Sequence, residues 1–294
     1  SYLPYSHQIN YFFQKYVTKG VFLSDDYLED RLEHARIHIG AWERYAGGSP
    51  PQNTLELGSG WYPVVPIALF LYGAKSIRTV DVTLLTNARH LRTTISRILD
   101  TADDGKLKNY LPAHPERLEQ LRALAAKMES LSFDQLTEAL HIEYLVKDAR
   151  KLPLDPDSID LIHSNNTFEH IYPDILAGIL REFKRILRPG GLQSHFIDLS
   201  DHFAHFDRSI TIYNFLRFSP AAWRWVDNSV QPLNRLRITD YRKLFETAGI
   251  SITEENLRPG DLEALRSVPV HPYFQKNSEA ENAVSHGYFF SKQS

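Results

Sequence analysis

A short glycine loop limits the fold of this sequence more than any other feature. Residues 54–57 form an apolar, strand-like segment that runs into Gly58-Ser59-Gly60, and residues 64–72 then show a helical pattern. A strand, a tight glycine turn and a helix in this order are typical of a parallel sheet whose turn lies at the carboxyl edge. Glycine at such a turn lets the backbone approach a ligand where a side chain would clash.

The same alternation of strands and helices continues along the chain. Helical patterns follow at residues 171–187 and 240–248, and further strand candidates are residues 76–82, 144–147, 158–163, 192–198, 250–253 and 287–290. Strands separated by helices favour parallel pairing with helices on both faces. We therefore predict an α/β fold with a Rossmann-like, seven-stranded, mostly parallel sheet.

Two helical regions lie outside this alternation. Residues 25–45 form one amphipathic helix, with Asp25 as the expected N-cap, so residues 1–50 are predicted to be an N-terminal helical cap on a main domain over 51–294. Residues 84–141 are long, polar and helical, with no strand signal. This segment is predicted to be a helical insertion, either a lid or a structural helix pair.

Composition excludes several classes of function. The chain has 294 residues, a net charge of −3 and no cysteine. No strong positive field is present to hold a nucleic acid, and disulfides, zinc–thiolate sites and cysteine nucleophiles are impossible. No stretch is long and apolar enough for a membrane span, and the first residues lack the pattern of a signal peptide. We expect a cytoplasmic protein without a nucleic-acid partner.

The acid after the next strand restricts the class of ligand that the loop can bind. Asp81 follows the loop at the spacing where a carboxylate binds two ribose hydroxyls. A nicotinamide enzyme would need a small residue at the third fingerprint position, where this chain has Pro63. Glu56, just before the first glycine, would repel a pyrophosphate but attract the amino group of a methionine moiety.

With these motifs the chain resembles the class I S-adenosylmethionine-dependent methyltransferases that act on small molecules. The resemblance spans residues 53–252 and the last strand candidate. It rests on motifs that follow the family's order, namely Glu56 to Gly60, Thr79 to Asp81, Lys147 to Ala149 with Leu152-Pro153, Ile159 to Asn165, Phe168 to Ile171, and Phe183 to Gly191. The spacing from Asp81 to Asp148 exceeds the compact family pattern, so nothing on the acceptor side is carried over.

The resemblance implies S-adenosylmethionine as the cofactor. The residues that it assigns to cofactor binding are Glu56, Gly58, Ser59, Gly60, Asp81, Val82, Asp148, Ala149 and Asn165. Among these, Glu56 to Gly60 form the first motif, Asp81 is the ribose acid, and Asp148 with Ala149 holds the adenine.

Methyl transfer from a sulfonium needs an in-line acceptor, and a hydroxyl or an acidic carbon also needs a base. The candidate catalytic residues follow the two strands whose carboxyl ends border the ligand, namely Glu169, His170, Asp198 and His202. Residues 198–207 hold three acids and two histidines. This segment is either a divalent-metal site, a substrate contact or a solvated loop, and no metal ligand is assigned.

Aromatic residues outside the motifs leave further alternatives open. The segment 203–225 lines an acceptor pocket, packs in the core, or forms the interface of a homo-oligomer. Tyr11, Phe12, Phe13 and Tyr16 are candidates to close the pocket from the N-terminal side.

We predict methyl transfer from S-adenosylmethionine to a small molecule, first of all to a hydroxyl of a sugar or secondary metabolite. C-methylation with Glu169 or His170 as the base is the second prediction. A nicotinamide oxidoreductase and a cofactor-binding protein without catalysis are the alternatives from other classes.

Overall fold

The computed structural model describes residues 22–227 and 232–294. Its centre is a seven-stranded sheet in the order β3-β2-β1-β4-β5-β7-β6. The strands are β1 (Asn53–Leu57), β2 (Ser76–Asp81), β3 (Ile142–Val146), β4 (Ile159–Asn165), β5 (Leu187–Asp198), β6 (Glu254–Arg258) and β7 (His286–Lys292). The predicted α/β class and the seven-stranded sheet are confirmed. Tyr11, Phe12, Phe13 and Tyr16 lie outside the described residues.

The strand order reverses between β1 and β4. From β1 the chain proceeds outward to β2 and β3 on one side, and then returns to place β4 and β5 on the other side. All these pairs are parallel, whereas β7 lies antiparallel between β5 and β6. In such sheets ligands bind at the carboxyl ends of the strands, at the point of reversal. This point lies between β1 and β4.

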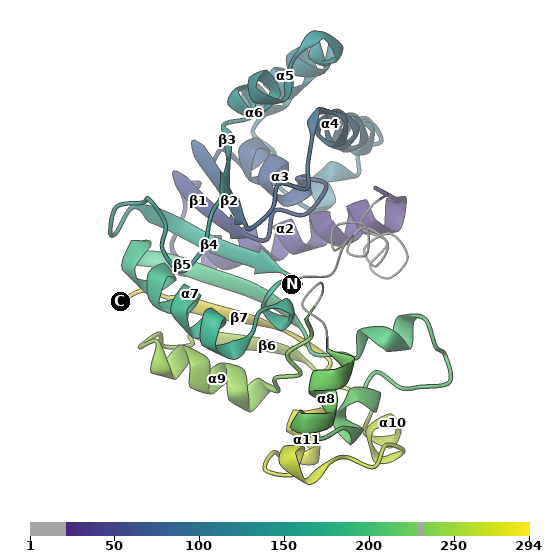
Figure 1. Ribbon diagram of the computed structural model, residues 1–294. Coiled ribbons are helices and arrows are strands. Elements are labelled where there is room, and N and C mark those ends of the chain that lie inside the picture. The colour runs from purple at the N-terminus through teal and green to yellow at the C-terminus, as the bar shows by residue number, and fades with distance from the viewer. Residues whose placement is uncertain (1–21, 228–231) are drawn as a thin grey trace.

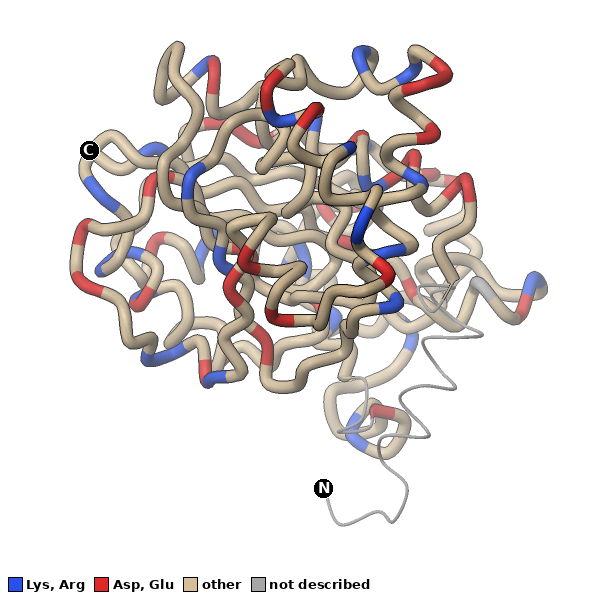
Figure 2. Tube along the Cα trace, turned by 90° about the horizontal axis from the view of Figure 1, so that it is seen from above, with Lys and Arg blue, Asp and Glu red and all other residues tan. Residues whose placement is uncertain are grey.

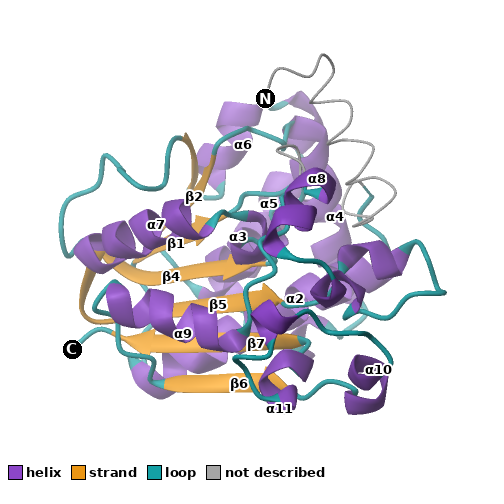
Figure 3. Ribbon diagram, turned by 60° about the horizontal axis from the view of Figure 1, so that its bottom comes forward, coloured by secondary structure: helices purple, strands orange, loops and turns teal. Residues whose placement is uncertain are grey.

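Helices cover both faces of the sheet (Figures 1 and 3). α2 and α3 lie on one face, and α7 and α9 lie on the other. The helices are α2 (Asp25–Tyr45), α3 (Val64–Tyr72), α4 (Ala88–Asp103), α5 (Pro115–Ala125), α6 (Phe133–Ala139), α7 (Pro173–Ile186), α8 (Pro220–Val226), α9 (Ile238–Thr247), α10 (Leu262–Arg266) and α11 (Glu279–Ala283). No helix of the described ranges is both long and apolar enough to cross a membrane.

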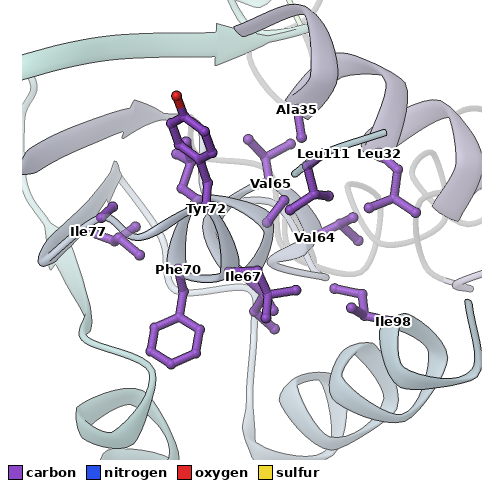
Figure 4. Packing of buried hydrophobic residues seen from close by; sticks show 14 of the residues in the cluster. Leu32, Ala35, Val64, Val65, Ile67, Phe70, Tyr72, Ile77, Ile98 and Leu111 are labelled. Carbon is purple, nitrogen blue, oxygen red and sulfur yellow. The ribbon is translucent and has the colours of Figure 1, made fainter. Parts of the chain in front are cut away.

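The larger hydrophobic core surrounds α3, in which every side chain is buried. Figure 4 shows Leu32 and Ala35 of α2 beside Val64 and Val65 of α3, with Ile98 of α4 close by. A helix that is apolar on all sides must be enclosed by other elements. α3 is therefore enclosed between the sheet, α2 and the predicted insertion.

The insertion consists of α4, α5 and α6, separated by 3-10 turns. Leu91, Ile95 and Ile98 of α4 are fully buried in the same core as α3, and Leu121 of α5 joins them. Through these buried contacts the insertion packs against α3 as a structural layer. The domain bounds 1–50 and 51–294 remain predictions.

Three local predictions were wrong. Residues 250–253, predicted to be a strand, form a connection, and β6 begins only at Glu254, where the register with β7 starts. β6 is a polar edge strand, so hydrophobicity did not reveal it. The N-cap of α2 is Ser24 rather than Asp25. The helix predicted from residue 240 begins earlier, because α9 starts at Ile238 with Arg237 as its N-cap.

Candidate functional site

The glycine loop lies at the reversal point, against the residues that follow β4. Gly58 has a φ of +88°, and a Cβ built on it would meet the Thr167 side-chain oxygen at 2.4 Å. Thr167 in turn donates from its hydroxyl to the carbonyls of Leu57 and Asn165. The loop therefore needs glycine at this position both for its backbone conformation and for its contact across the two strands.

Asp81 at the end of β2 is bonded to the same loop. Its carboxylate accepts from the backbone N–H of Ser59 at 3.0 Å and from that of Thr83 at 3.3 Å. Burial raises the pKa of the carboxyl group. The structure thus joins the predicted ribose acid to the predicted glycine loop.

Two apolar side chains are exposed beside this acid. Val82 is 78% exposed and Val146, at the end of β3, is 49% exposed. Exposed valines at the carboxyl ends of adjacent strands are suited to the face of an adenine ring. The sequence indicated Val82 but not Val146, whose only signal was its place as the last apolar residue of a strand.

Asp148 and Ala149 follow β3. The Asp148 carboxylate accepts from the Arg150 side chain and backbone, and this lowers its pKa to about 2. Ala149 is buried in the core. Asp148 therefore already has a cationic partner, and its predicted contact with adenine stays a prediction.

Glu56, at the end of β1, is only 6% exposed. Burial raises its pKa to about 8, against the opposing effect of the Arg31 guanidinium. The nearest imidazole, that of His163, lies 3.8 Å away and is itself kept neutral by burial. At neutral pH Glu56 is a protonated acid that an incoming cationic amino group would ionise.

Polar residues of α2 reach the same strand ends. The His38 imidazole Nε2 lies 2.9 Å from the side-chain oxygen of Asn165, whose amide nitrogen has no partner. Arg31 donates to Asn166 at 2.8 Å. Sequence reasoning missed His38 and Arg31. The sequence feature that could have revealed them is the presence of polar side chains on the apolar face of a predicted helix.

The four predicted catalytic residues lie together after β4 and β5. We call Glu169, His170, Asp198 and His202 the acid–histidine cluster. The His202 Nε2 lies 3.3 Å from the Asp198 carboxylate, and the rings of His170 and His202 are 5.0 Å apart. Glu169, His170 and His202 each offer a ligand atom within 4.8 Å of the others.

The four residues of the cluster differ in the direction in which their pKa is shifted. Burial raises the pKa of Glu169 to about 8, with Asp198 adding to the effect, and burial lowers the pKa of His170 to about 4. Burial opposes ionisation of Asp198 and His202 as well, but their mutual attraction lowers the pKa of Asp198 and raises that of His202. Asp198 therefore favours the charged form of His202, whereas burial favours the neutral forms of Glu169 and His170.

One polar residue missed in the sequence holds the cluster in place. Asn234 donates from its side chain to the carbonyls of Phe168 and Ile171, and its backbone N–H donates to the carbonyl of Glu169. Because Asn234 comes from a loop far along the chain, no local pattern indicated it.

Asp201 and Asp207, the other two acids of the segment 198–207, bind within their own loops. The Asp201 carboxylate accepts from the backbone N–H of Phe203, and Asp207 accepts from Ser209. Two of the three acids in this segment thus have hydrogen-bond partners in their own loops, and its interpretation as a metal site, a substrate contact or a solvated loop stays a prediction.

The aromatic segment is divided between core and surface. Tyr213 and Phe215 are fully buried, and Trp223 packs with them against α10 and α11. Phe203, Phe206 and Trp225 are exposed. Lys and Arg positions are interspersed with Asp and Glu on the face shown in Figure 2, without a basic stripe.

Comparison with known proteins agrees with this geometry. A family model described as a methyltransferase domain matches residues 113–194, which run from the insertion through β3 and β4 into β5. The match shows similarity to a methyltransferase domain over this part of the chain. The predicted enzyme class and its cofactor, S-adenosylmethionine, are thereby confirmed, and the nicotinamide alternative is not supported. No curated protein matches the chain significantly.

Solved structures of methyltransferases are similar to this chain at low sequence identity. The geranyl diphosphate C-methyltransferase of Streptomyces coelicolor A3(2) has a TM-score of 0.50 and 10% identity, over 100% of this chain and 99% of that chain. A putative methyltransferase in complex with the Trm112 activator of Haloferax volcanii has a TM-score of 0.48 and 18% identity, over 95% of both chains. A putative sarcosine dimethylglycine methyltransferase of Galdieria sulphuraria has a TM-score of 0.46 and 16% identity, over 90% of this chain and 86% of that chain.

Proposed function

We propose that this methyltransferase transfers the methyl group of S-adenosylmethionine to a hydroxyl of a small molecule, such as a sugar or a secondary metabolite. One observation carries the proposal. Thr167, which contacts the glycine loop, is separated from Glu169 by a single residue. The acid–histidine cluster therefore begins two residues after the contact with the glycine loop. A proton acceptor next to the methyl donor is what a hydroxyl acceptor requires.

The donor site is built from the residues after β1, β2 and β4. Asp81 would bind the ribose hydroxyls, the Gly58–Gly60 loop would approach the methionine part, and Glu56 would take its amino group. Val82 and Val146 supply the apolar surface for adenine. Asn165 has a free amide N–H to offer at the same edge.

The acid–histidine cluster receives the proton of the acceptor. When bound, the cofactor would supply the methyl group to the hydroxyl oxygen and leave as the neutral thioether, and the hydroxyl proton would pass to the cluster. His202 can take this proton only in its neutral form, and the Asp198 carboxylate then orients the imidazole and stabilises the charged form that results.

The donor site is tested first by calorimetry. Wild type is expected to bind S-adenosylmethionine and S-adenosylhomocysteine but not NADH. Asp81→Ala is expected to lose most of this affinity because the ribose hydroxyls lose their acceptor and the loop loses its anchor at Ser59. Equal affinity in the variant would refute the ribose assignment.

The acceptor is tested with methyl-labelled cofactor and fractions of a small-molecule extract. The carbon chemical shift of the transferred methyl group distinguishes oxygen, nitrogen and carbon acceptors. We expect an oxygen-bound methyl group, and Asp198→Asn or His202→Gln to lower kcat by roughly 100-fold or more with little effect on cofactor affinity. A nitrogen-bound methyl group with normal turnover in both variants would contradict the proposal.

C-methylation is the second candidate, and one observation favours it. Glu169 is almost completely buried and its pKa is raised to about 8, which makes its ionised form a stronger base than an ordinary carboxylate. A carbon-bound methyl group in the labelling experiment, together with loss of turnover in Glu169→Gln, would establish this alternative.

A further inference from the structure

Glu169 is the least satisfied polar side chain of the acid–histidine cluster. It is 1% exposed, and neither of its carboxylate oxygens has a hydrogen-bond partner. A buried carboxyl group without a partner costs folding free energy, so its retention calls for a ligand that satisfies it.

The two neighbouring histidines are suited to the same ligand. The Nδ1 of His170 lies 2.8 Å from the carbonyl oxygen of Pro232, to which it donates, so that Nε2 carries the lone pair of a neutral imidazole. A backbone carbonyl in this role is the usual outer partner of a metal-binding histidine. The Asp198 carboxylate orients His202 in the same manner from 3.3 Å.

The distances permit a single ion. One ligand atom each of Glu169, His170 and His202 lies within 4.8 Å of the other two. Ligands at about 2.0–2.2 Å from one zinc ion are closer together than this, so a small inward movement of the side chains completes the site. The His202 side chain remains 13% exposed, which leaves one side of the set open.

We propose that Glu169, His170 and His202 form a binding site for one divalent transition-metal ion. Two imidazoles and one carboxylate favour zinc, manganese, iron or cobalt over magnesium, which prefers an all-oxygen set. Three protein ligands with an open position are typical of a metal that also binds a substrate. Its catalytic use rests on the proposed function, since the open position would take the oxygen of the acceptor hydroxyl.

The site is tested on the full chain, stripped with a chelator and then loaded with zinc or cobalt. We expect one ion per chain by elemental analysis, a cobalt absorption spectrum typical of nitrogen and oxygen ligands, and a higher Tm after loading. Glu169→Gln, His170→Ala and His202→Gln should each lose stoichiometric binding, and Asp198→Asn should weaken it by about 10- to 100-fold. His114→Ala, at an exposed position on the distant insertion, is the matched control and should bind as wild type.

Glu169→Gln also separates loss of a ligand from misfolding. The amide removes a buried carboxyl without partners, so the stripped variant should melt at or above the wild-type Tm while the increase with metal disappears. Failure of wild type to retain one ion, or retention of that ion in all three ligand variants, would overturn the proposal. Normal metal binding in a protein that methylates no hydroxyl would contradict the proposed function alone.

Discussion

Two buried acids mark the two ends of the candidate reaction path. Glu56 and Glu169 both have a pKa raised to about 8 by burial, but their surroundings differ. Glu56 precedes the glycine loop, and the charge of Arg31 opposes the rise of its pKa. Glu169 instead lies beside two histidines. We therefore expect the same residue type to bind a cationic amino group at one site and a proton or a metal ion at the other.

Cofactor binding is predicted to release a proton from Glu56. The free protein holds this carboxyl group protonated below a pH of about 8, and the cationic amino group of the cofactor requires it ionised. The affinity for S-adenosylmethionine should therefore rise with pH up to about 8 and then level off. Calorimetry at pH 7 in buffers of different ionisation enthalpy should show release of close to one proton.

Glu56→Gln is the control for this proton. The variant should bind more weakly, and its affinity should no longer depend on pH in this range. Release of the same number of protons by wild type and variant would assign the proton to another group.

Gly58→Ala is predicted to destabilise the protein even without cofactor. A left-handed backbone costs an alanine about 1–2 kcal/mol, and here the added methyl group also meets Thr167. Gly105→Ala is the matched control, because Gly105 has a similar φ of +70° with nothing within 4 Å. Denaturant unfolding should show a clearly larger loss for Gly58→Ala, and equal losses would mean that the Thr167 contact is easily relieved.

At the scale of elements, α9 fixes the segment that follows β5. The Arg237 side chain is fully buried and donates to the carbonyls of Leu199, Asn282 and Val284. It thereby joins the residue after Asp198 to the end of α11 and the chain that enters β7. The position of Asp198 thus depends on a cation outside the acid–histidine cluster.

Arg237→Met is therefore predicted to cost at least about 2 kcal/mol of unfolding free energy, because three buried carbonyls lose a charged donor. Arg242→Met, on the exposed side of the same helix, loses only surface ion pairs with Glu255 and Glu281 and should cost less than about 1 kcal/mol. Thermal unfolding of both variants measures the difference. Comparable losses would show that the carbonyls find other donors.

For the whole molecule, the insertion is part of the core. Because α4 closes the hydrophobic cluster around α3, Ile95→Ala should cost about 2–5 kcal/mol. Ser96→Ala, one residue further along α4, should change stability by less than about 0.5 kcal/mol. A lid would give the opposite pattern, with little loss of stability and a large change in KM for the acceptor. Denaturant unfolding beside steady-state kinetics distinguishes the two.

The sequence alone determined the alternation of the fold and the residues that follow β1, β2, β4 and β5. Periodicity and turn glycines are local signals, so β1, the glycine loop and Asp81 were predictable, as was the presence of Glu169, His170, Asp198 and His202 at two adjacent strand ends. Local signals failed where an element is defined by its partners. β6 is polar because it lies at the edge, and its bounds depend on pairing with β7.

Only the tertiary structure decided which of these groups meet. It paired Asp148 with Arg150, turned Asp201 and Asp207 to their own loops, and brought His202 to Glu169 and His170. It also brought in Arg31, His38 and Asn234 from distant segments. The physical reason is that burial and contact across the sheet set both the geometry and the pKa of a side chain, and neither is encoded by sequence spacing.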